Sequence, residues 1–203
     1  YIKIFIEQFH HRIGCFIFAD SGKTTLNGNT STINCSGAFS GGDLTTYNIV
    51  NLTGATSTIT GNNTFANLTF DASAAAAQTI TLSASGTQTV SGTFTATGDS
   101  TANRCTIQSS SAGTSSTINA ATVAVTKASI KDLIGAGAGS WAMGASSDVL
   151  KISGGSGITF RLFWVGSTGN WSSIGEWAST SGGAANAVVV TDSVTSAYFD
   201  ANS

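Results

Sequence analysis

The sequence has no proline and very little charge, and both deficits narrow the classes of protein it can belong to. None of the 203 residues is proline, and only 9% are Asp, Glu, Lys or Arg, against about 25% in an ordinary soluble domain. Proline has no backbone N–H to donate to a β-ladder, so its absence fits a chain that is largely hydrogen-bonded in sheets. Because hydrophobic residues reach 41%, the composition differs from that of a disordered chain. We expect a folded protein whose surface consists of hydroxyls, amides and backbone groups.

Basic clusters and long apolar runs are missing as well. The eight Lys and Arg residues are scattered singly and the formal net charge is -2, which gives a phosphate backbone no patch to bind. No apolar run approaches the ~18 residues that cross a bilayer. We therefore expect neither nucleic-acid binding nor a membrane span.

Cysteine and histidine are too few, and too badly spaced, for a metal site. Cys15, Cys35 and Cys105 have no CxxC spacing, so they predict neither a zinc site nor a disulfide scaffold, although a single Cys15–Cys35 bridge stays open. Each cysteine also stands where a small buried hydrophobe would serve. His10 and His11 are adjacent, so on a strand they would point to opposite faces and could not chelate one metal. No metal or other cofactor is expected.

What the chain does have is alternation of apolar and polar residues between Gly22 and Phe160. The alternating runs are Tyr47-Asn48-Ile49, Leu68-Thr69-Phe70, Ile80-Thr81-Leu82, Cys105-Thr106-Ile107 and Val123-Ala124-Val125. A period of two predicts strands with one buried face, and the Gly, Asn, Asp and Ser clusters between the runs predict tight turns. No segment shows a helical stripe. The predicted fold class is all-β.

Short motifs recur along the same region. One theme is repeated at Ser31–Asn34, Ser57–Thr60 and Ser116–Asn119, and a second at Ala77–Ile80 and Thr87–Val90. Degenerate repeats of short strands are typical of stacked coils, so we predict a parallel β-helix or solenoid, with a β-sandwich as the main competitor. With roughly 20 to 28 residues per coil and ~4.8 Å per layer, the region would hold about five or six coils.

The first and last coils of such a stack expose unpaired backbone groups. The N-terminal residues Tyr1, Ile2, Ile4, Phe5 and Ile6, with Lys3 among them, form a strand-like segment that could take part in assembly. We expect this segment to cover its own first coil, with pairing to a neighbouring subunit as the alternative.

The C-terminal region carries the most specific motif. The sequence reads W-V-G-S-T-G-N-W at residues 164–171, then Trp177, S-G-G-A at residues 181–184 and F-D-A-N-S at residues 199–203. This pattern resembles a module of long, repetitive Ser/Thr/Gly-rich β-solenoid proteins from environmental bacteria and tailed phages. Residues 63–70 and 86–93 resemble coils of the same proteins. Glu176 departs from the pattern, which usually has His before the third Trp.

The resemblance implies a surface or virion component of tandem, modular construction, and it carries over no catalytic residues. Within the module, Trp164, Asn170, Trp171 and Trp177 could form a platform for a carbohydrate, because sugar C–H faces stack on indole rings. The favoured interpretation is that the indoles fill the core of a small β-meander that closes the solenoid. Trp141 is expected to be a plug of the core.

Three aspartates are candidates for an active site. Asp43, Asp71 and Asp99 are equally spaced along the chain, so they would stack on one face if each coil had the length of that spacing. Turn formation explains each of them equally well, and they have no accompanying Lys, Arg or His. We expect no catalytic activity.

The sequence therefore predicts an N-terminal arm (1–21), a β-solenoid (22–160) and a Trp-rich β module (161–203) that caps or continues the array. The expected protein is an extracellular, non-catalytic structural or adhesive subunit of a fibre at a cell or virion surface. Copies of itself or neighbouring repeat units are the expected partners, with a cell-surface glycan as a further candidate. A glycan-binding module that uses Trp171 and Trp177 is the first alternative, and a solenoid polysaccharide-degrading enzyme is the second.

Overall fold

The computed structural model describes residues 15–16, 32–36, 39–41, 45–72, 77–99, 103–143, 152–165, 177–178 and 195–198. The described residues form strands and turns and contain no helix, which confirms the predicted all-β class.

Two sheets contain all the strands of this described part. The larger sheet is made of β1 (Cys15–Phe16), β2 (Thr32–Cys35), β3 (Phe39–Gly41), β4 (Thr45–Leu52), β5 (Thr56–Ile59), β6 (Asn63–Ala72), β7 (Gln78–Leu82), β8 (Thr87–Gly98), β9 (Cys105–Ser109), β10 (Ser116–Thr126), β11 (Ala128–Ala136) and β13 (Ile152–Ser156). The smaller sheet is made of β12 (Ala142–Met143), β14 (Thr159–Trp164), β15 (Trp177–Ala178) and β16 (Thr195–Tyr198).

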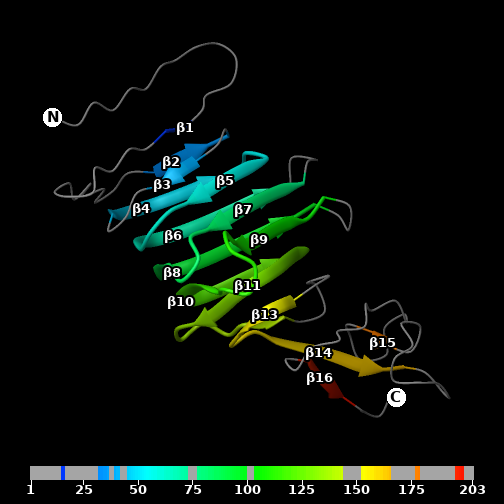
Figure 1. Ribbon diagram of the computed structural model, residues 1–203. Coiled ribbons are helices and arrows are strands. Elements are labelled where there is room, and N and C mark those ends of the chain that lie inside the picture. The colour runs from blue at the N-terminus through cyan, green and yellow to red at the C-terminus, as the bar shows by residue number, and fades with distance from the viewer. Residues whose placement is uncertain are drawn as a thin grey trace, which may run out of the picture.

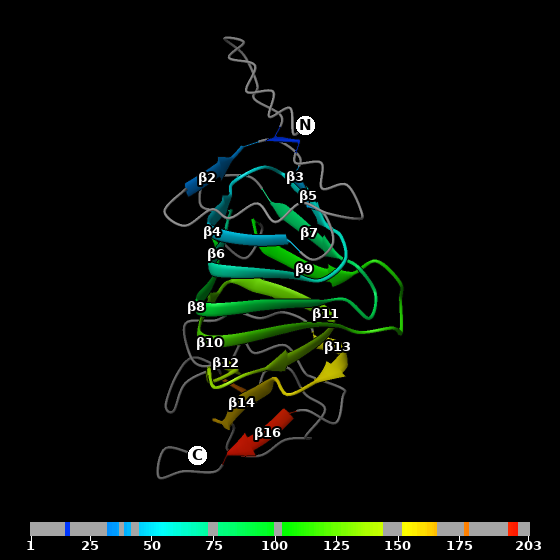
Figure 2. The same cartoon turned by 90° about the vertical axis from the view of Figure 1, so that its left-hand side faces the viewer.

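The larger sheet is parallel and curls round on itself. Its odd-numbered strands β1, β3, β5, β7 and β9 pair in that order, and its even-numbered strands β2, β4, β6, β8 and β10 pair in a second series. β11 joins the two series, because Ala128 to Lys131 pair with β9 and Leu133 to Ala136 pair with β10. Figure 1 and Figure 2 show the resulting stack, with the strands lying one above another from the blue to the yellow end. This architecture is compatible with a β-solenoid, and we call each turn of the chain round the stack a coil.

Coil length varies more than the sequence repeats suggested. Thr45 pairs with Asn63, and Asn63 pairs in turn with Gln88. Gln88 then pairs with Ile118. The number of residues that separates two register partners along the sequence increases from each of these pairings to the next. The expected coil length of roughly 20 to 28 residues holds for the second of these steps, whereas the first is shorter and the third is longer, because the turns that connect the strands differ in length.

The repeated motifs do not mark equivalent positions in successive coils. Ile33 pairs with Val50, whereas Ile59 pairs with Leu82. The third copy of the same motif lies on β10, where Ile118 pairs with Gln88. The repeats therefore reflect a shared preference for short strands, and they do not give the register between coils.

The core consists of inward residues that meet their register partners in the next coil. We call such a set of partners a column, and in one of them Ile80, Ile107 and Ile130 follow one another with no exposed surface. Complete burial of each such side chain contributes about 1.5 to 3 kcal/mol. Aromatic contacts reinforce the stack: the Tyr47 and Phe65 rings are stacked at 5.1 Å, and Phe70 meets Phe94 edge-on at 5.3 Å.

The inward–outward alternation predicted from the sequence holds within straight segments. In β7 and β9 every second residue is buried, as expected for Ile80-Thr81-Leu82 and Cys105-Thr106-Ile107. It fails where the long strands bend: the β6–β8 pairing shifts between Phe65 and Leu68, and two half-buried residues separate those two buried ones. The expected alternation at Tyr47-Asn48-Ile49 is wrong for the same reason, since Ile49 is half-buried and Val50 takes the inward position.

The smaller sheet is mixed. β14 runs parallel to β12 and β16, and antiparallel to β15. β16 pairs with β14 and not with β15, so the described strands after residue 158 lack the strand-to-next-strand antiparallel pairing of the expected β-meander.

Candidate functional surfaces

The outer face of β5, β7 and β9 carries two columns of neutral polar side chains, all but one of them threonine. Thr56 pairs with Thr79, which pairs with Thr106. Two residues along, Thr58 pairs with Thr81, which pairs with Gln108. Thr56 and Thr58 are exposed and the other four are half-buried. We call these six residues the threonine face.

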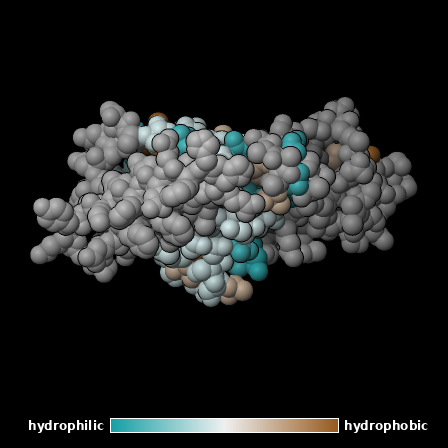
Figure 3. All heavy atoms as spheres, turned by 90° about the horizontal axis from the view of Figure 1, so that it is seen from above, coloured by the Kyte–Doolittle hydropathy of each residue, from teal (hydrophilic) through white to brown (hydrophobic). Residues whose placement is uncertain are grey.

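Neutral polar columns cover the other series of strands too. Thr46, Thr64, Thr89 and Asn119 form one column, and Asn34, Asn51, Thr69 and Thr95 form another. In the second column the Asn51 Nδ2 donates to Asn34 Oδ1 at 2.8 Å. Figure 3 shows the molecule from above, with pale and teal residues predominating over brown ones where the surface is coloured. The described exterior is therefore hydroxylated and poor in charge.

Gln78 is a buried polar side chain that ties three coils together. Its Nε2 donates to the carbonyl oxygens of Leu52 at 2.7 Å and Gly54 at 2.9 Å. Its Oε1 accepts from the Cys105 thiol at 3.5 Å. These bonds join the turn after β4 to β7 and β9, so the amide is satisfied although the side chain is only 1% exposed.

Gln88 performs the same role at a second corner. Its Nε2 donates to the Gly61 carbonyl at 2.7 Å, and its Oε1 accepts from Asn63 Nδ2 at 2.9 Å. The Asn63 amide also donates to the Thr60 carbonyl. In the sequence, Gln78 and Gln88 stand out only as parts of a repeat. The signal that could have identified them is a polar amide in phase with the inward apolar positions, as in Gln78-Thr79-Ile80.

Trp141 closes the C-terminal end of the core, which confirms the expected plug. The side chain is 5% exposed, its ring lies 5.7 Å from that of Phe94, and its Nε1 donates to the Ala136 carbonyl at 2.9 Å.

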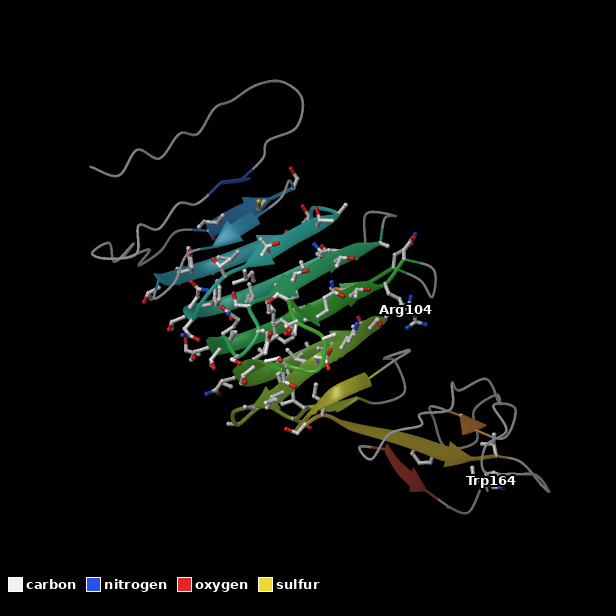
Figure 4. All side chains as sticks on the ribbon, in the orientation of Figure 1. Arg104 and Trp164 are labelled. Atoms are coloured by element: carbon white, nitrogen blue, oxygen red, sulfur yellow. The ribbon has the colours of Figure 1, made fainter. Side chains whose placement is uncertain are left out.

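The candidate carbohydrate platform is described only in part. Trp164 and Trp177 are register partners on the antiparallel strands β14 and β15. The Trp164 side chain is half-buried and packs against the core cluster, and Figure 4 shows it at the end of β14. Asn170 and Trp171 lie outside the described residues, as does the side chain of Trp177. The assembly residues Tyr1, Ile2, Ile4, Phe5 and Ile6 also lie outside them.

Asp71 and Asp99, two of the three candidate aspartates, do not stack on one another. Asp71 on β6 pairs with Thr97 on β8. Asp99 lies two residues beyond Thr97 and is not the register partner of Asp71, and its carbonyl oxygen accepts from Lys127 Nζ at 2.5 Å. Asp43 lies outside the described residues.

Cys105 is a buried, unreactive thiol. It has no exposed surface, and burial raises its pKa to about 12, with the negative charge of Asp71 adding to the effect. Cys35 is buried as well, so both cysteines occupy positions of small hydrophobes, as predicted. The Cys15 side chain lies outside the described part, and with it any Cys15–Cys35 bridge.

Sequence reasoning also missed Arg104. It is the residue before β9, it is 6% exposed, and its carbonyl oxygen accepts from the Gln78 backbone N–H at 3.1 Å. Figure 4 places it at the turn end of β9. A single arginine in a Ser/Thr-rich segment gives no sequence signal of burial.

No group of three or more His, Cys, Asp and Glu side chains in the described residues could hold a metal ion. The same residues contain no helix that is long and apolar enough to span a membrane.

No protein-family model matches the chain, and neither a curated protein nor a solved structure shows significant similarity to it.

Proposed function

We propose that the protein is an extracellular, non-catalytic structural or adhesive subunit of a fibre, built as a β-solenoid over residues 22–160 with a Trp-bearing β module over residues 161–203. Copies of itself or neighbouring repeat units are its partners at a cell or virion surface.

The observation that carries the proposal is the continuity of the inward columns. Val50, Leu68 and Phe94 are register partners in three successive coils, and all are fully buried. Lateral hydrogen bonds and stacked side chains then hold each coil to the next along the whole axis. A stack of this kind suits a load-bearing rod, and its charge-poor exterior suits close contact between copies.

The N-terminal edge supports self-association. β2 pairs with β4 on one side, and its sequence, Thr32 to Cys35, contains no charge and no proline. Soluble sheet proteins protect such edges with Lys, Pro or bulges, because an unprotected edge recruits strands of other chains. An uncharged edge therefore fits a subunit that continues its sheet into a neighbour.

Electron microscopy of the purified protein under native conditions, with light scattering after size exclusion, tests the proposal. The wild type should form filaments, and Thr32→Lys with Asn34→Lys should shorten or abolish them by charging the edge strand. Thr56→Lys with Thr58→Lys is the matched control on β5 and should leave filament length unchanged. Only monomers in the wild type would remove the filament proposal.

A glycan-binding role is the second candidate, because the register places Trp177 beside Trp164 and so gathers two indole-bearing residues at one point of the smaller sheet. Sugar rings bind to such aromatic groups through their C–H faces. A glycan array should then report signals that fall with Trp171→Ala and with Trp177→Ala but persist with Thr95→Ala. An unchanged profile in both Trp variants contradicts this candidate.

A further inference from the structure

The threonine face has a regular register over three neighbouring strands. β5, β7 and β9 pair without any shift of register, whereas the β6–β8 and β8–β10 pairings shift between Phe65 and Leu68 and between Ala120 and Thr122. Register partners lie ~4.8 Å apart across the strands, and outward residues repeat every ~6.6 Å along each strand. The six side chains therefore occupy a regular, two-dimensional grid.

The side chains on this grid are chemically uniform and stiff. Five of the six are threonines, each with a hydroxyl that donates and accepts and a methyl group beside it. Branching at Cβ restricts their rotamers, so the groups are ordered before any ligand arrives, which lowers the entropy cost of binding. The sixth residue is tied to the grid, because Gln108 Nε2 donates to Thr81 Oγ1 at 3.4 Å.

The face is also free of charge and of aromatic rings. All six outward residues are neutral, and the first charge beyond them in the paired columns is Lys131 on β11, the register partner of Gln108. An ionic ligand would find no countercharge on these six residues. A crystalline polysaccharide would find no aromatic ring on which its sugar faces could stack.

We propose that the threonine face binds the surface of an ice crystal. Ice is uncharged and rigid, and it presents donors and acceptors that repeat in two dimensions at distances comparable to those of this grid. The threonine hydroxyls would join the outermost water layer, and the methyl groups would sit between its water molecules. This activity is independent of the proposed fibre, although a filament would multiply the number of grids that meet one crystal.

The test measures thermal hysteresis and the inhibition of ice recrystallisation by the purified full-length protein. The wild type should shape ice crystals and hold back their growth, and Thr81→Tyr should abolish most of the hysteresis because a large ring protrudes from the grid of short side chains. Thr95→Tyr is the matched control on the other series of strands and should retain the wild-type value. Tyrosine is favoured in strands, and circular dichroism should show both variants folded.

Three results would overturn the proposal. The first is a wild-type protein that neither shapes ice nor slows its growth. The second is an equal loss of hysteresis in Thr81→Tyr and Thr95→Tyr. The third is a protein that leaves ice unaffected but sediments with crystalline cellulose or chitin, which would assign the face to a polysaccharide.

Discussion

At the scale of single residues, the polar side chains in the core act as ties between coils. Gln78 donates to two backbone carbonyls of a neighbouring turn, and Gln88 donates to one. A buried carbonyl without a partner costs more free energy than a satisfied hydrogen bond contributes. The two glutamines therefore fix where the chain turns, while the apolar residues supply most of the favourable free energy of burial.

Replacing Gln78 by Ala should lower the free energy of unfolding by about 2 to 4 kcal/mol, because the carbonyls of Leu52 and Gly54 lose their donor. Gln108→Ala is the control, since this glutamine lies on the outer face, and it should change stability by only about 0.5 kcal/mol. Urea denaturation of both variants measures the difference. Equal losses would show that Gln78 does not tie the coils.

Cys105 should make the protein sensitive to alkali. Its folded pKa of about 12 lies above the ~8.5 of a thiol in an unfolded chain, so from about pH 9 upward the unfolded state binds fewer protons than the folded state. The free energy of unfolding should then fall by up to about 1.4 kcal/mol per pH unit between about pH 9 and pH 12. Below about pH 8 the thiol is protonated in both states, so Cys105 should cause no loss of stability there.

Urea denaturation at about pH 8 and about pH 10.5 measures this dependence. Cys105→Ala should have a shallower decline, because only this ionisation has been removed. If the wild type and the variant decline in parallel, the alkaline sensitivity has another origin.

At the scale of elements, the turns decide how tightly successive coils approach. Gly137 follows β11 with a φ of 96°, and a Cβ placed there would collide with the Ala120 carbonyl oxygen. That carbonyl also accepts from the Gly139 backbone N–H at 2.9 Å. The turn after β11 therefore needs both a left-handed conformation and the absence of a side chain.

Gly137→Ala should cost about 3 kcal/mol or more, because backbone strain of about 1 to 3 kcal/mol adds to a contact with the Ala120 carbonyl. Gly113→Ala is the matched control: its φ is also positive, at 79°, but a Cβ would meet nothing within 4 Å. It should cost about 1 kcal/mol, from strain alone. Thermal unfolding followed by circular dichroism compares the two, and similar losses would mean that close packing at Gly137 is unimportant.

At the scale of the whole molecule, stability should be distributed along the stack. Each coil contacts only the coils next to it, so the free energy of local opening depends on how many neighbours a strand has. β6 and β8 lie between other strands on both sides, whereas β2 pairs with β4 alone within the described sheet.

Hydrogen exchange measured by mass spectrometry should therefore show a gradient for the unassembled protein. Peptides that cover β6 and β8 should exchange slowest, and the peptide that covers β2 should exchange faster than these. In filaments the β2 peptide should gain protection, because its edge would be paired. Uniform protection along the chain would show that the coils open together, and it would contradict a stability that depends on the number of neighbouring strands.

The alternation of residues determined which side chains face inward, because period two is a local property of an extended backbone. Leu68-Thr69-Phe70 and Ile80-Thr81-Leu82 have the burial that this pattern predicts. The all-β class and the absence of helix among the described residues follow from the same local preferences. The sequence also predicted that Cys35, Cys105 and Trp141 are buried, because each has a hydrophobic side chain within the region predicted to form the core.

Only the tertiary structure decided which residues became neighbours. Turn lengths vary between coils, so no fixed period in the sequence could place Asp71 opposite Thr97 or Trp164 opposite Trp177. The bend between Phe65 and Leu68 interrupts the alternation where the long strands turn, and the unshifted pairing of β5, β7 and β9 keeps the register of one face regular. Sequence alone determined the orientation of each strand's faces because that depends on adjacent residues, whereas lateral register depends on the packing of segments that are far apart along the chain.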